Sequence, residues 1–157
     1  MRQYLHFNPI TISIFFRWLG AIAFFALIWD GVTLLFGRQI VPEFMTQAYE
    51  TADILPLFWI ALIGASPLLE ELFFRGFLFE GIRYSRLGPL GAVILTSIIW
   101  ATMHIQYGAY EIISIWLLGL LLGFAKLKTQ SIYTTIGMHS LANLWATIEV
   151  AVYLKIR

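Results

Sequence analysis

The sequence contains no cysteine, and only 12% of its 157 residues are charged. The missing cysteines exclude disulfide bonds, thiolate metal ligands and a cysteine nucleophile, so any chemistry must rest on carboxylates, imidazoles, hydroxyls and amides. The net charge of +1, with basic residues scattered along the chain, gives no basis for a nucleic-acid partner. Apolar residues make up 60% of the chain, which is more than a soluble domain of this size can bury.

Apolar stretches long enough to span a bilayer dominate the chain. A spanning helix needs ~20 mostly apolar residues. The pattern therefore predicts an all-α, polytopic transmembrane bundle of about five helices, at residues 10–35, 54–79, 90–104, 110–125 and 131–153. The sequence Gly64-Ala65-Ser66-Pro67 either kinks the second helix or divides it, with Ser66 as a cap; the second alternative gives six helices.

The basic residues indicate how the chain is oriented in the membrane. Alternating spans place Arg2, Arg83, Arg86, Lys126 and Lys128 on one side, and Arg38, Lys155 and Arg157 on the other. Because cytoplasmic loops carry an excess of Lys and Arg, the first side is predicted to be cytoplasmic. We expect a multi-pass integral protein of the cell (cytoplasmic) membrane.

Three charged residues lie within the second predicted span. Each costs at least ~2.5 kcal/mol at the centre of a spanning helix, so Glu70, Glu71 and Arg75 need an explanation. Glu71 and Arg75 are four residues apart, share a helix face and are expected to form an ion pair. Glu70 is rotated by about 100° and must find another partner. Taken alone, these residues also fit a purely structural network.

Other spans carry polar side chains at a similar depth. His139 and Asn143 are four residues apart and project from one face, and His104 ends the third predicted span. The helical rise places Glu70, His104, His139 and Asn143 between ~12 and ~21 Å from the cytoplasmic ends of their spans. Polar groups gathered in one slab indicate a single water-filled cavity.

This set of side chains can hydrolyse a peptide bond without a covalent intermediate. A carboxylate and an imidazole, here Glu70 and His104, can deprotonate a shared water molecule. An imidazole with a nearby amide, here His139 and Asn143, can donate hydrogen bonds to the oxyanion that forms. The pair of Glu71 and Arg75 would hold this arrangement, and no cofactor is needed.

Three short motifs carry a resemblance to a known family. They are Glu70-Glu71-Leu72-Phe73-Phe74-Arg75, which matches E-E-x-x-x-R and is followed by Gly76; Trp100 to His104, which matches F-x-x-x-H with Trp in place of Phe; and His139 to Asn143, which matches H-x-x-x-N. At these residues the chain resembles the CAAX prenyl protease 2 family, also called the Abi or CPBP family of glutamate-type membrane proteases.

The resemblance implies a function for each part of the chain. Glu70 and His104 would activate water, His139 and Asn143 would form the oxyanion hole, and Glu71 and Arg75 would support them. The substrate would be a membrane-anchored or lipid-modified protein or peptide. Relatives are tied to CAAX-like or C-terminal anchor processing, surface protein sorting, and bacteriocin maturation or immunity. We expect a single membrane domain over residues 1–157, with the first span and loop at 1–53 and the catalytic helical core at 54–153.

Other functions remain open at this point. A zinc-dependent membrane protease could use Glu70, His104 and His139 as ligands, although the sequence lacks H-E-x-x-H. A non-catalytic membrane immunity or binding protein, or a transporter with these residues as a proton relay, would also place polar groups at depth.

Two further features of the sequence lie outside the predicted site. Gly119 and Gly123 form a G-x-x-x-G that is expected to let two helices of the monomer pack closely. Asp30 lies in an apolar helical run without an evident partner.

Overall fold

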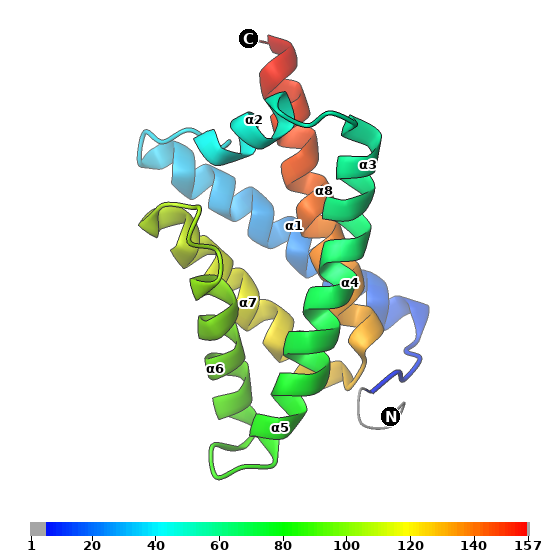
Figure 1. Cartoon of the computed structure of the whole chain (residues 1–157). Coiled ribbons are helices and arrows are strands. Elements are labelled where there is room, and N and C mark those ends of the chain that lie inside the picture. The colour runs from blue at the N-terminus through cyan, green and yellow to red at the C-terminus, as the bar shows by residue number, and fades with distance from the viewer. Residues whose placement is uncertain (1–5, 157) are drawn as a thin grey trace.

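The structure, a computed structural model, describes residues 6–156, which form helices and no strand (Figure 1). The predicted all-α fold is confirmed. Six helices follow one another: α1 (Ile12–Leu35), α2 (Glu43–Glu50), a composite helix over residues 55–83, α6 (Gly88–Thr102), α7 (Ala109–Thr129) and α8 (Ile132–Ile156). The sixth helix is α2, which lies in a segment that the sequence pattern assigned to a polar loop, and does not come from a break at Pro67.

The composite helix is continuous through its central proline. It consists of α3 (Leu55–Ile60), η1 (Ala61–Ala65), α4 (Ser66–Glu71), η2 (Leu72–Leu78) and α5 (Phe79–Arg83). Proline normally disturbs a helix because it lacks an N–H and clashes with the preceding turn. The π-helical segment η1 widens the helix just before Pro67, which relieves that clash. Ser66 therefore starts no separate helix, and its hydroxyl donates to the Glu70 carboxylate.

Within residues 6–156, three helices are long and apolar enough to cross a membrane: α1, the composite helix and α7. The 15-residue α6 is also apolar but shorter, and it ends at Thr102. His104 was expected at the last position of this helix, but it lies in the turn that follows. The N–H groups of Met103 and His104 bond to carbonyls of the last helical turn and close that turn early.

Helix α2 lies across one end of the bundle, between the end of α1 and the start of α3 (Figure 1). Its buried Met45 and Tyr49 pack with Val41 and with Val150 of α8. Tyr107, from the turn between α6 and α7, donates its hydroxyl hydrogen to Met45 Sδ at 3.0 Å. Burial raises the pKa of Tyr107 to about 12, so the phenol stays protonated and keeps this contact. The helix missed by the sequence pattern is thus fixed to the bundle.

Helices α6 and α7 approach closely at two glycines, as the G-x-x-x-G predicted. A Cβ atom at Gly119 would lie 3.1 Å from Ser97 Cβ and 3.1 Å from Trp100 Cε3, and one at Gly123 would lie 3.0 Å from a Val93 methyl group. A side chain at either position would therefore push against residues of α6, which would have to shift to make room.

Substitution of Gly119 by leucine should therefore destabilise the protein. Overpacking of a tight contact costs roughly 1–3 kcal/mol, because side chains and backbone must shift. Gly20 is the matched control, since a Cβ atom there meets nothing within 4 Å. Thermal unfolding in detergent should show a lower Tm for Gly119→Leu and little change for Gly20→Leu. Equal Tm values for both variants would contradict the close packing of α6 and α7.

Candidate active site

Glu71 is the buried centre of a charged network. Its carboxylate is fully buried, and Oε1 accepts a hydrogen bond from Arg75 Nη1 at 2.8 Å and another from His139 Nδ1 at 3.0 Å. The ion pair between Glu71 and Arg75, expected from their spacing, is confirmed. The contact to His139 joins α4 to α8 across 68 sequence positions, and spacing along one helix gives no signal for it.

Arg75 extends this network to two neighbouring helices. Its Nη2 donates to the Gly119 carbonyl of α7 at 3.3 Å. Its guanidinium carbon lies 4.6 Å from the centre of the Trp100 ring of α6, a cation–π distance. One buried side chain thus connects the composite helix to α6 and α7.

Glu70 faces a different environment from its neighbour. It is half-buried; Oε1 accepts a hydrogen bond from Ser66 Oγ, and Oε2 accepts one from Trp100 Nε1 at 2.6 Å. Both donors are neutral. The carboxylate is therefore held in position without an ion pair of its own, and Ser66 acts as a donor to Glu70 and not as a helix cap.

Trp100 connects the polar residues to one another. Its carbonyl is 2.8 Å from His104 Nδ1, and its ring lies 5.1 Å from the rings of both His104 and His139. Because a carbonyl can only accept, Nδ1 of His104 carries the proton and Nε2 has the free lone pair. Sequence reasoning treated Trp100 only as a departure from the motif. A buried indole N–H needs a hydrogen-bond partner, and this requirement could have indicated that Trp100 contacts a polar residue of the site.

Asn143 is held by the irregular part of the composite helix. Its Nδ2 donates to the Leu62 carbonyl at 2.8 Å, within the π-helical segment η1. The second N–H of the amide and its oxygen remain for other contacts. A π-helical turn is a common feature of functional sites, but nothing in the residue pattern predicted it here.

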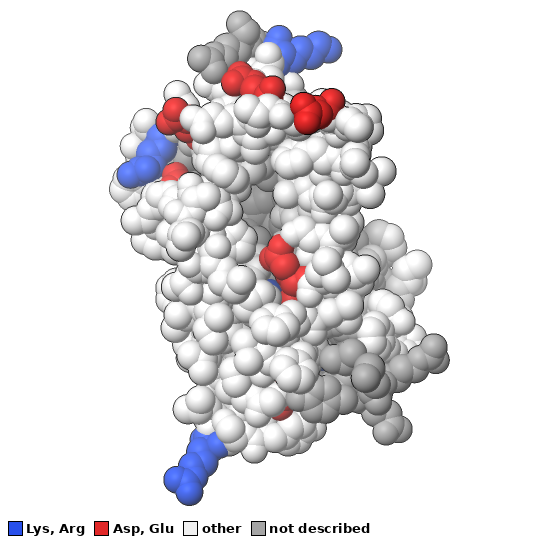
Figure 2. Space-filling model, viewed as in Figure 1, with Lys and Arg blue, Asp and Glu red and all other residues white. Residues whose placement is uncertain are grey.

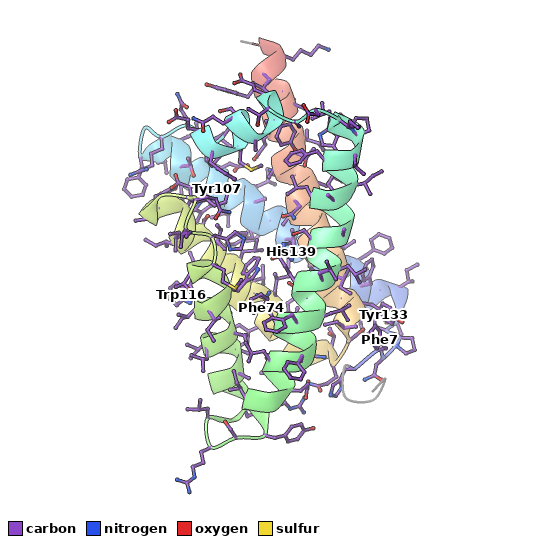
Figure 3. The ribbon with its side chains drawn as sticks, in the orientation of Figure 1. Phe7, Phe74, Tyr107, Trp116, Tyr133 and His139 are labelled. Carbon is purple, nitrogen blue, oxygen red and sulfur yellow. The ribbon has the colours of Figure 1, made fainter. Side chains whose placement is uncertain are left out.

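These side chains line a cavity of about 470 Å³ inside the bundle. All four predicted catalytic residues border it: Glu70, His104, His139 and Asn143. Glu71 and Arg75 do not border it and lie behind its wall. In Figure 3, His139 lies at the middle of the bundle, with Phe74 on one side and Tyr107 towards α2. The structure therefore brings the predicted residues together, from α4, the turn after α6, and α8.

The same cavity accounts for Asp30, which the sequence left without a partner. Trp145 Nε1 lies 3.2 Å from Asp30 Oδ2 and 2.6 Å from Glu149 Oε1, so the indole donates to both carboxyl groups. All three residues border the cavity. Within residues 6–156, no group of three or more histidine and carboxylate side chains is arranged to hold a metal ion.

Comparison with known families decides the identity of the chain. Residues 52–145, more than half of it, match the family described as type II CAAX prenyl endopeptidase Rce1-like. The chain belongs to this Rce1-like family. Membership makes it a membrane protease, and the matched region contains all three motifs. No curated protein and no solved structure matches the chain.

The charged network around Glu71 predicts how substitutions in it change the stability of the folded protein. Arg75→Met leaves the Glu71 carboxylate buried beside His139 without its cation, which should cost about 3–5 kcal/mol. The double variant Arg75→Met, Glu71→Gln removes both charges and should recover much of that loss. Thermal unfolding in detergent measures both. Additive losses in the double variant would show that the two charges do not depend on each other.

Proposed function

We propose that the chain is a glutamate-type intramembrane endopeptidase, in which Glu70 and His104 activate water without a metal ion. The observation that supports this most is the distribution of polar groups: four side chains with hydrolytic chemistry border one cavity, while the ion pair that would neutralise a carboxylate lies behind its wall. A purely structural network would not need the cavity.

Water activation would begin at the two groups that are free to accept a proton. Glu70 has neutral donors, so its carboxylate charge stays available to a water molecule. His104 has its Nδ1 proton fixed by the Trp100 carbonyl, which leaves Nε2 as a base. A water molecule between them loses a proton as its oxygen attacks the peptide carbonyl carbon, and that proton later passes to the leaving amine.

The oxyanion would be stabilised from α8. When the His139 ring carries both protons, its Nδ1–H donates to Glu71 and its Nε2–H can donate to the oxyanion. Asn143 supplies the N–H that Leu62 does not use. The two histidines thus differ in partner, one a carbonyl and one a carboxylate, and this difference supports His104 as the base and His139 as the donor.

The substrate would be a membrane-anchored or lipid-modified protein or peptide, cleaved by a multi-pass protein of the cell membrane. The cavity supports this class because most of its wall is apolar, with polar groups confined to the site and to the α2 end. Such a wall accommodates a chain that is already in the bilayer.

Glu70→Gln keeps the size and the hydrogen-bond acceptor of the side chain but removes its charge. We expect cleavage to fall by about 10²–10⁴-fold, because the general base is lost. Glu111→Gln is the matched control, since Glu111 borders the same cavity near α2. Mass spectrometry of membrane peptides from cells with the wild type and with each variant would show a product that Glu70→Gln lacks and Glu111→Gln retains.

Detection of the same cleavage product, with and without a chelator, separates the alternative functions. Activity that survives a strong chelator excludes the zinc-dependent protease, and activity that the chelator removes and zinc restores would overturn the metal-free mechanism. Identical peptides from the wild type and Glu70→Gln would instead favour a binding or immunity role.

Trp100→Phe tests how Glu70 is held. Phenylalanine keeps an aromatic ring and the backbone carbonyl to His104, but it cannot donate to Glu70. A hydrogen bond to a charged group contributes ~1.5–3 kcal/mol, so kcat should fall by about 10–100-fold with little change in KM. The control is Trp116→Phe, which removes a buried indole N–H away from the cavity. An equal effect of both variants, or a change in KM alone, would exclude the positioning role.

A further inference from the structure

The proposed base, His104, lies on a turn between two helices. Helix α6 ends at Thr102 and α7 begins at Ala109, and the six residues between them form turns and irregular backbone. The regular helical repeat, which places Glu70 and His139, does not extend to this turn. The position of His104 therefore depends on the contacts that hold the turn.

Most of this turn lies at the surface. Met103 and Ile105 are 64% and 83% exposed, and within residues 102–109 only positions 104 and 107 are not exposed. Figure 2 shows a hollow with acidic atoms inside it at mid-height on the side of the bundle, and Figure 3, in the same view, labels His139 at that height. The surroundings of the site are thus not packed solidly on this side, and Tyr107 is left as the anchor of the turn.

Tyr107 contacts His104 through its backbone and through its ring. Its N–H donates to the His104 carbonyl at 3.0 Å, and the centres of the two rings are 6.3 Å apart, with 32° between their planes. On the other side, Nδ1 of His104 lies 2.8 Å from the Trp100 carbonyl. The imidazole is thus held from both directions along the chain, by the last turn of α6 and by Tyr107.

Helix α2 holds Tyr107 from outside the turn. The phenol donates its hydroxyl hydrogen to Met45 Sδ at 3.0 Å, and the rings of Phe44 and Tyr107 meet edge to face with 5.1 Å between their centres. Met45 is itself buried in a cluster with Val150 of α8. A series of contacts therefore runs from α2 through Tyr107 to His104.

These contacts suit a positioning role and not a direct part in proton transfer. Burial raises the pKa of Tyr107 to about 12, and its hydroxyl hydrogen is directed at Met45. Helix α2 lies outside residues 52–145, which match the Rce1-like family. Tyr107 thus joins the matched region to a part of the chain that the family match does not cover.

We propose that Tyr107 positions the general base: it connects α2 to the turn and holds the His104 imidazole where it can share a water molecule with Glu70. The effect on catalysis rests on the proposed function, whereas the connection between Tyr107 and the His104 ring does not. A substitution of Tyr107 should therefore slow the chemical step much more than it weakens substrate binding.

Tyr107→Leu removes the aromatic ring and the hydroxyl but keeps much of the side-chain volume. We expect kcat to fall by about 10–100-fold with little change in KM, because a correctly placed general base contributes ~10²–10⁴-fold. Tyr107→Phe retains the ring and should recover most of that loss. The assay uses a synthetic peptide that spans a bond whose cleavage requires Glu70, at a temperature at which each variant is folded in detergent.

Tyr110→Leu is the matched control. Tyr110 also borders the cavity, but its hydroxyl and its ring contact Thr33 and Trp29 of α1. This variant should leave kcat nearly unchanged. An equal loss of kcat in Tyr107→Leu and Tyr110→Leu, or a change in KM alone, would overturn the positioning role.

A spectroscopic measurement tests the connection without any substrate. The sequence contains three histidines, so isotope labelling of histidine gives few ring signals in NMR spectra, and His104→Gln identifies that of His104. Tyr107→Leu should shift or broaden the His104 signal, whereas Tyr110→Leu should not. The signal of His139, which Glu71 holds, should stay the same in both variants. An unchanged His104 signal in Tyr107→Leu would overturn the proposal whatever the activity.

The two measurements also separate failure of the proposal from failure of the protease function. If the wild type and Glu70→Gln yield the same peptides, the protease function fails, and with it the effect of Tyr107 on catalysis. The His104 signal still decides whether Tyr107 holds the imidazole in place.

Discussion

The arrangement of the site depends on one buried carboxylate. Glu71 lies in an apolar bundle where an isolated charge would cost several kcal/mol, and its two donors make that burial possible. One donor, Arg75, reaches α7 and the ring of Trp100, and the other, His139, comes from α8. The need to satisfy this charge therefore fixes the helices that carry the proposed oxyanion donors relative to the helix that carries Glu70.

The adjacent glutamate can have a different role because of helix geometry. A rotation of about 100° between neighbours turns Glu71 into the protein and Glu70 towards the cavity. Glu71 is paired with Arg75 and His139, whereas Glu70 receives hydrogen bonds from the neutral donors Ser66 and Trp100. Two adjacent glutamates thus have different roles: Glu71 is a buried structural anion, and Glu70 is a candidate general base.

The sequence predicted those features that depend on local spacing or on the cost of burying charge. The pair of Glu71 and Arg75, the close approach at Gly119 and the gathering of four polar residues at one depth all follow from the helical repeat and from lipid as a solvent. The contacts of Trp100 to Glu70 and of His139 to Glu71 could not be predicted, because they depend on how distant helices pack. Helix α2 was missed because its eight residues are too few for an apolar membrane signal.

Helix α2 also explains how an apolar bundle can admit water to a site near its middle. A cavity closed at both ends would have no supply of the second reactant, and a channel open at both ends would leak. Tyr107 and the cluster around Met45 hold α2 against α8 and the turn after α6, so it forms one wall of the mouth without closing it. The packed pair of Glu80 and Lys126 closes the other end. The proposed hydrolysis would need a supply of water, and the α2 end of the cavity is where the surface lies nearest to its lining residues.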